Sequence, residues 1–92
     1  MKRLLIVDDE PLVLHAMRRL LQRHFTPQEL SIEISTDPLH ALQRLHATHF
    51  DVVISDYRMP RLEGVALLAH ARDLDPCTVR MMLSAAAEFS AV

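Results

Sequence analysis

The sequence predicts an α/β protein in which helices cover both faces of a doubly wound parallel sheet. Two observations lead to this fold class. Short, unbroken apolar runs alternate along the chain with longer segments whose apolar residues recur at helical spacing, the pattern of repeated strand–helix units. In addition, 50% of the 92 residues are hydrophobic, which favours a packed core, and this length allows one domain.

The first half of the chain is expected to form two strands, each followed by a helix. Residues 4–7 are an apolar run of the kind found in parallel strands buried on both faces. Pro11 suits the first turn of a helix, which we expect to reach about residue 24. Its apolar residues at helical spacing are Val13, Ala16, Met17, Leu20 and Leu21. Residues 31–35 alternate apolar and polar side chains as a strand does, and Asp37 is expected to cap the next helix.

The second half repeats the same pattern. Residues 51–55 contain three consecutive β-branched residues and are expected to form a third buried strand. A helix is expected over residues 64–74, and Asp75 with the proline after it should end that helix. Residues 78–83 are expected to form the fourth strand, and residues 85–92 begin what should be a fourth helix.

Charge and cysteine content exclude several classes of protein. The chain has 10 Lys and Arg against 12 Asp and Glu, so nothing in its charge predicts direct binding to nucleic acid. Its single cysteine, Cys77, cannot form an intramolecular disulfide. No apolar run is long enough to span a membrane, and the N-terminal run is too short for a signal peptide. We therefore expect the protein in a reducing cytoplasm.

Polar side chains follow three of the predicted strands. Asp8, Asp9 and Glu10 come after the first strand, Asp56 ends the third, and Ser84 ends the fourth. Each of these alone could be a helix cap or a turn residue. Ligands of open α/β sheets bind beyond the carboxyl ends of the strands. The occurrence of these polar residues together at that edge therefore predicts a binding site there. Clustered carboxylates with open positions suit Mg²⁺.

Three segments of the chain resemble one known family. Residues 5–11 read LIVDDEP, residues 56–64 read DYRMPRLEG, and residues 82–85 read MLSA. In this order and at this spacing they resemble the receiver domain of response regulators in two-component signal transduction, and the resemblance covers the whole chain. It implies a flavodoxin-like fold in which the strand order 2-1-3-4 is present and the family's fifth strand and last helix are missing.

The resemblance also implies a phosphoacceptor switch and the residues that perform it. Asp56 takes a phosphoryl group from the phosphohistidine of a sensor histidine kinase or a phosphotransfer protein. Asp9 and Asp56 bind Mg²⁺ directly, Asp8 binds it through water, and the main-chain carbonyl of Arg58 completes the protein ligands. Ser84 hydrogen-bonds the phosphoryl group and passes the change on to the output. On this reading the protein is no enzyme beyond its own phosphorylation and dephosphorylation.

The sequence departs from the family pattern at its C-terminal end. The family places an essential lysine at the end of strand five, whereas the only lysine here is Lys2, at the opposite end of the first strand. We therefore expect residues 1–92 to be a receiver domain that is incomplete at its C-terminus, with an output domain possible beyond Val92. Because strand four would then form an apolar edge, we also expect this piece to associate with itself.

Other interpretations remain open at this stage. The missing lysine would suit a pseudo-receiver that makes protein contacts without being phosphorylated. A haloacid-dehalogenase-type hydrolase needs an Asp-x-Asp pair after the first strand, which this chain lacks. His46 and His49 could share a helix face but have no third ligand nearby in sequence. A basic cluster on the first helix, Arg18, Arg19 and Arg23, is expected to be a solvated face or a docking surface for the kinase.

Overall fold

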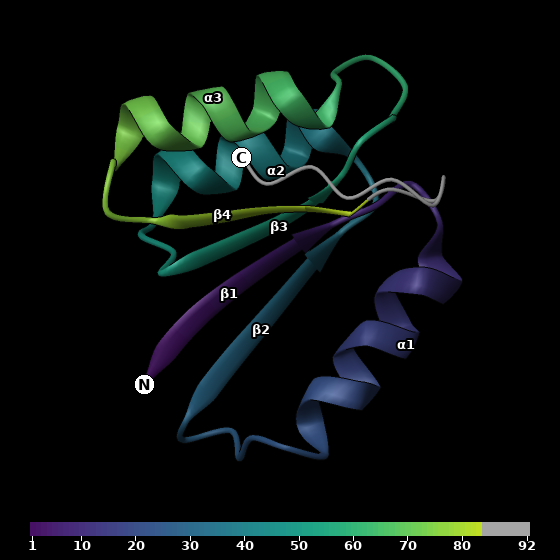
Figure 1. Cartoon of the computed structure of the whole chain (residues 1–92), viewed down its shortest axis with the longest axis vertical. Helices are drawn as coiled ribbons and strands as arrows, with labels where there is room; N and C mark the ends of the chain where they lie inside the picture. The colour runs from purple at the N-terminus through teal and green to yellow at the C-terminus, as the bar shows by residue number, and fades with distance from the viewer. Residues whose placement is uncertain (84–92) are drawn as a thin grey trace.

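The computed structural model describes residues 1–83, which form a parallel sheet with helices on both faces (Figure 1). The strand order is β2-β1-β3-β4, so the predicted fold class and order are confirmed within this range. In chain order the elements are β1 (Lys2–Val7), α1 (Pro11–Gln22), β2 (Leu30–Ser35), α2 (Pro38–Ala47), β3 (Val52–Asp56), α3 (Gly64–Leu74) and β4 (Val79–Leu83).

The ends of these elements follow local chemistry. β1 begins two residues before its apolar run because Lys2 pairs with Leu30 of β2 and its N–H donates to the carbonyl of Glu29. Asp37 caps α2 as predicted, since its side-chain Oδ1 accepts the Leu39 N–H at 3.0 Å. α3 ends at Leu74, where the sequence places a stop.

The core between the sheet and helices α2 and α3 also holds the loop after β3. β1 contributes Leu5 and Val7, which are almost completely buried and point to the same face because they are two residues apart. The other buried members of this core are Ala41, Phe50, Val53, Met59, Leu67, Leu68 and Ala71. Since Met59 comes from the β3–α3 loop, the packing of this core restrains that loop.

The opposite face of the sheet packs against α1 through a different stripe from the one predicted. Leu14 is 1% exposed and packs with Leu4, Ile6 and Ile54. Of the residues assigned to the apolar stripe of α1, Met17 and Leu21 pack against this core, but Val13, Ala16 and Leu20 are exposed. The inward stripe is therefore Leu14, Met17 and Leu21, and α1 turns its other apolar side away from the described part of the sheet.

Two expectations fall on residues that the structure does not describe. These are Ser84 and the fourth helix over residues 85–92. Within the described residues 1–83, no helix has both the length and the apolar character needed to cross a membrane.

Candidate functional site

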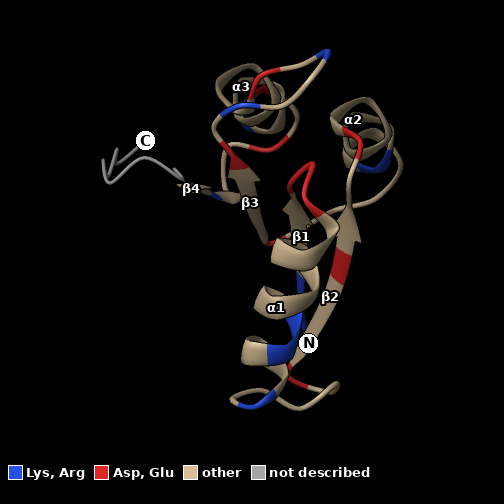
Figure 2. Cartoon of the chain, turned by 90° about the vertical axis from the view of Figure 1, so that its right-hand side faces the viewer, with Lys and Arg blue, Asp and Glu red and all other residues tan. Residues whose placement is uncertain are grey.

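Three carboxylates meet at the carboxyl edge of the sheet. Asp8, Asp9 and Asp56 each place an oxygen within 4.8 Å of the others. Asp8 is buried, Asp56 is half-buried and Asp9 is exposed, so the cluster opens to solvent on one side. Figure 2 shows acidic segments in red at the ends of β1 and β3. The structure thus brings together the three acids that the sequence predicted at this edge.

The strand register explains why the acids are neighbours. Val7 of β1 is paired with Ser55 of β3 in a parallel ladder, so the next residues, Asp8 and Asp56, lie side by side. On its other side, Asp8 continues the ladder between β1 and β2 by donating its N–H to the carbonyl of Ser35 at 3.2 Å. Its side-chain Oδ1 then accepts the Glu10 N–H at 2.9 Å, which turns the chain toward α1.

The acids after β1 are not helix caps of the ordinary kind. Glu10 occupies the N-cap position of α1, and its side chain makes no capping hydrogen bond. Asp8 binds the Glu10 N–H two residues later, and this bond bends the connection rather than capping the helix. Glu10 therefore holds the N-cap position without a side-chain capping bond, and the carboxylate of Asp9 contributes to the cluster.

Electrostatics favour a cation in this cluster. Burial raises the pKa of Asp8 above its ordinary value, and the charges of Asp56 and Asp9 raise it further, while the hydrogen bond from the Glu10 N–H opposes the shift. Burial also raises the pKa of Asp56, with a contribution from Asp9 and an opposing hydrogen bond from the Tyr57 N–H. Three anions so close together repel one another. A hard divalent cation with oxygen ligands, such as Mg²⁺, fits this donor set.

The loop after β3 is closed tightly around Asp56. The Tyr57 N–H donates to Asp56 Oδ1 at 2.8 Å and to the carbonyl of Leu83 at 2.9 Å. The Gly64 N–H donates to the carbonyl of Tyr57 at 3.0 Å, which joins the two ends of the loop. A Cβ on Gly64 would lie 2.0 Å from the carbonyl oxygen of Asp56, so only glycine fits at this position. Gly64 is the chain's only glycine, and that was the sequence signal for this close approach.

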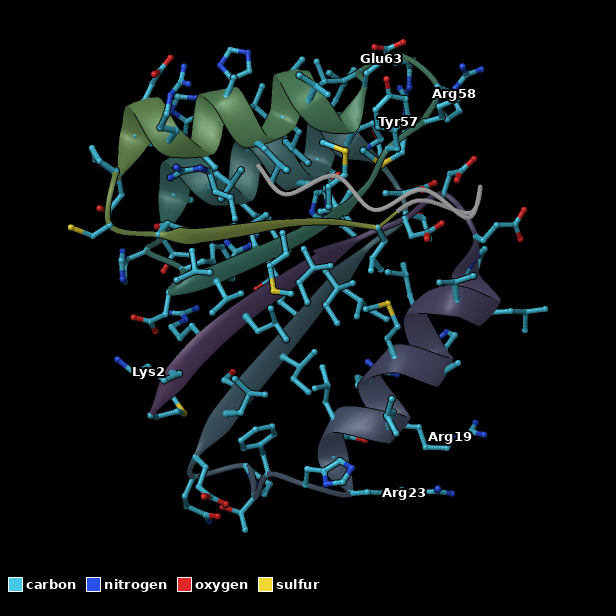
Figure 3. All side chains as sticks on the ribbon, in the orientation of Figure 1. Lys2, Arg19, Arg23, Tyr57, Arg58 and Glu63 are labelled. Carbon is cyan, nitrogen blue, oxygen red and sulfur yellow. The ribbon has the colours of Figure 1, made fainter. Side chains whose placement is uncertain are left out.

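The other residues singled out in the sequence are Arg58, Ser84 and Lys2. Arg58 lies in the β3–α3 loop two residues after Asp56, and its side chain points away from the molecule (Figure 3). Ser84 lies outside the described residues. Lys2 lies at the amino end of β1, at the far end of the sheet from the acids, so it cannot reach them (Figure 3).

His49, which was considered as a metal ligand, instead lies beside acidic side chains. His49 lies between two carboxylates, with its Nε2 3.2 Å from Asp51 Oδ1 and its Nδ1 2.8 Å from Asp75 Oδ2. Both ring nitrogens therefore face acidic side chains at the amino end of the sheet. Among residues 1–83, the three aspartates are the only group of side chains close enough together to hold a metal ion.

The fold and the position of the acids define a doubly wound α/β domain with its ligand edge at the carboxyl ends of β1 and β3. A family model for the response regulator receiver domain matches residues 4–92, and the chain belongs to this family. Receiver domains are the phosphorylation-dependent signalling modules of two-component systems, and they bind Mg²⁺ in an acidic pocket. The family predicted from the three sequence segments is thus confirmed.

Solved structures support the same conclusion. The chain is similar to response regulator protein TrrA from Thermotoga maritima in complex with Mg²⁺ and BeF, with 28% identity, a TM-score of 0.84, and coverage of 95% of this chain and 72% of that one. It is also similar to a chain in the complex of histidine kinase ThkA with TrrA. That match has 26% identity and a TM-score of 0.85, and it covers 100% of this chain and 76% of the other.

Curated relatives are much longer than the matched region. The chain is 35% identical over 87 residues to an uncharacterised response regulatory protein of Staphylococcus epidermidis, covering 91% of this chain and 33% of that protein. It is 32% identical over 77 residues to a protein-glutamate methylesterase/protein-glutamine glutaminase of Anaeromyxobacter dehalogenans. That match covers 84% of this chain and 21% of that protein. The chain thus spans about a fifth to a third of the length of these relatives.

Proposed function

We propose that the protein is a phosphoacceptor switch in which Asp56 takes a phosphoryl group from the phosphohistidine of a sensor histidine kinase or a phosphotransfer protein. The observation that carries this proposal is the cluster of Asp8, Asp9 and Asp56, whose oxygens approach within 4.8 Å at the carboxyl edge of the sheet. No reaction beyond the phosphorylation and dephosphorylation of the protein itself is proposed.

Asp56 is the best placed of the three acids to act as the nucleophile. It ends β3, which lies between β1 and β4, and the Tyr57 N–H orients its carboxylate through Oδ1. Asp8 is buried, whereas Asp56 is half-buried and so more open to a phosphodonor. In the transfer, an oxygen of Asp56 forms a bond to phosphorus as the bond between phosphorus and the donor's imidazole nitrogen breaks. The released imidazole takes up a proton, and the product is an aspartyl phosphate.

The same acids are proposed to hold Mg²⁺. We assign Asp9 and Asp56 as direct ligands, Asp8 as a ligand through water, and the main-chain carbonyl of Arg58 as the remaining protein ligand. When bound, Mg²⁺ neutralises the charge that accumulates as an anionic carboxylate meets an anionic phosphoryl group. Ser84 is proposed to hydrogen-bond the phosphoryl group and so to connect phosphorylation to the output.

Labelling with a small phosphodonor tests the assignment of Asp56. The protein is treated with acetyl phosphate with and without Mg²⁺, and the modified residue is located by mass spectrometry. We expect label on Asp56 that depends on Mg²⁺ and is lost in Asp56→Asn. Asp73→Asn, which changes an exposed acid on α3, is the matched control and should label like the parent. Label retained on another acid in Asp56→Asn contradicts the proposal.

A second candidate function is a pseudo-receiver that is not phosphorylated and only makes protein contacts. It is favoured by the position of Lys2, which lies at the far end of the sheet from the acids and so cannot take the role of the family's catalytic lysine (Figure 3). The labelling experiment separates the two candidates, since a pseudo-receiver takes no label from acetyl phosphate. For the phosphorylated candidate we expect weak labelling of residues 1–92 and stronger labelling of any longer protein that contains them.

A further inference from the structure

One residue of the β3–α3 loop has a backbone conformation that L-amino acids rarely adopt. Arg61 has a φ of 72°, and it is the only non-glycine residue with positive φ among residues 1–83. The Leu62 N–H donates to the carbonyl of Pro60 at 2.9 Å, two residues earlier, which makes Arg61 the centre of a γ-turn. The form of this turn with positive φ is rare and strained, so neighbouring structure has to stabilise it.

The side chain of Arg61 is held by the cap of a different helix. Its Nη2 lies 2.7 Å from Oδ2 of Asp37, the N-cap residue of α2. The other carboxylate oxygen of Asp37, Oδ1, accepts the Leu39 N–H at 3.0 Å. Both oxygens are therefore in use, and the Asp37 carboxylate has a fixed orientation. The Asp37–Arg61 ion pair therefore joins the strained turn to the start of α2.

The tethered loop is the one that carries Arg58. At its base, the Gly64 N–H is bonded to the carbonyl of Tyr57, and in its middle Met59 is buried in the core to 7% exposure. The Asp37–Arg61 ion pair is a third attachment, on the far side of Met59 from Arg58. Three attachments within eight residues restrict the directions in which the carbonyl of Arg58 can point.

We propose that the Asp37–Arg61 ion pair is a positioning contact, which maintains the γ-turn at Arg61. By holding this turn, the ion pair maintains the loop shape needed for Mg²⁺ binding beside Asp56. The inference rests on the proposed function, because it assumes that the metal binds at the acid cluster. It adds two residues that lie outside the cluster, and it makes the start of α2 part of the machinery that sets metal affinity.

Three variants test the contact while preserving the rest of the fold. Asp37→Asn keeps an N-cap acceptor and removes the charge, Arg61→Gln removes the guanidinium, and the double variant removes both partners. Arg72→Gln is the matched control, because Arg72 also pairs with an aspartate and its side chain is exposed to the same 59% as that of Arg61. Amide chemical shifts followed during a Mg²⁺ titration give the dissociation constant of each protein.

We expect each single variant to bind Mg²⁺ roughly two- to fivefold more weakly than the parent, the range that an exposed ion pair supports. The double variant should be no weaker than either single one, because the two residues act through one contact. In metal-free protein, the Leu62 amide should exchange faster with solvent in all three. Affinity unchanged in both single variants, or effects that simply add in the double variant, would overturn the proposal.

The substitution Arg61→Gly tests the effect of the backbone conformation separately from the effect of the ion pair. Glycine adopts positive φ without strain, so Arg61→Gly should bind Mg²⁺ more tightly than Arg61→Gln although both lack the ion pair. An Arg61→Gly protein that binds more weakly than Arg61→Gln overturns the role given to the turn. If the parent protein shows no Mg²⁺ response, the proposed function fails as well. If the parent binds Mg²⁺ and the variants bind equally well, only the positioning role fails.

Discussion

The substitution Gly64→Ala gives the sharpest test of the site geometry. The added Cβ would lie 2.0 Å from the carbonyl oxygen of Asp56, 3.0 Å from its carbonyl carbon and 3.1 Å from Ser55 Oγ. Ordinary van der Waals contact begins at 3.4 Å, so the backbones of Gly64 and Asp56 must separate by about 1.4 Å. The carbonyl group of Asp56 cannot rotate away, because it belongs to the main chain of β3.

We expect this separation to affect stability and the site together. Overpacking of this kind costs about 1–3 kcal/mol of unfolding free energy. Helix propensity acts in the opposite direction, since alanine is preferred over glycine by roughly 0.8–1.0 kcal/mol inside a helix. Moving the main chain of Asp56 should also weaken Mg²⁺ binding and phosphorylation, because displacements of about 1 Å at a reacting group can cost about 100-fold in rate.

Urea denaturation and a Mg²⁺ titration measure both effects. The controls are His70→Ala and His70→Gly, at an exposed position of the same helix, which give the propensity difference without the close approach. Gly64→Ala should be less stable than the parent even though His70→Ala is more stable than His70→Gly. A Gly64→Ala protein as stable as the parent, with unchanged amide shifts around Asp56, refutes the close approach.

Three further predictions concern charge and the sheet edge. Asp56→Asn should stabilise the metal-free protein at pH 7 by less than about 1 kcal/mol after solvent screening. Because the pKa of Asp56 is raised in the folded state, its charged carboxylate destabilises the folded protein at pH values above that pKa, and asparagine removes this penalty. Urea denaturation at a series of pH values should show the gain disappearing as pH falls through the pKa of Asp56. Glu33→Gln should destabilise by less than about 1 kcal/mol, because the Arg44 guanidinium lowers the pKa of Glu33; the same titrations should show the loss vanishing as pH falls through the lowered pKa. The 92-residue chain should self-associate through β4, where Met81 is 49% exposed, and Met81→Lys should reduce this in light scattering over a concentration series. A monomer at every concentration, with protected amides in β4, contradicts that last prediction.

Local patterns predicted the elements and the acid cluster because these depend on short stretches of sequence. The apolar runs locate the strands, although β1 begins two residues before its run, and parallel pairing then brings the residues after β1 and β3 to one edge. Asp37 was recognised as a helix cap for the same reason, since a cap contacts a backbone N–H only two residues away.

Contacts between distant segments were beyond the reach of such patterns. The pairing of Asp37 with Arg61 joins two loops 24 residues apart, and spacing within either segment gives no sign of it. The inward face of α1 was predicted only in part: Met17 and Leu21 were assigned to it, but Leu14 was missed, because Leu14 and Val13 both fit a helical repeat and only the packing of the helix on the sheet decides between them. The close approach of Gly64 to Asp56 was not predicted either, although the position of the chain's only glycine was a sequence signal for it.

The position of β1 at the centre of the described sheet has a consequence for how the protein opens. β1 is hydrogen-bonded on both sides and buried on both faces, whereas β4 pairs with β3 alone within residues 1–83. Local opening should therefore begin at β4 and reach β1 last, which amide exchange would record as a gradient across the sheet. Asp8 belongs to the slow part of this gradient. Asp56 borders the fast part, since the Tyr57 N–H next to it is bonded to Leu83 of β4. The acid cluster thus depends on the interior strands β1 and β3 and, beside Asp56, on a contact with β4, so opening of β4 should disturb Asp56 before it disturbs Asp8.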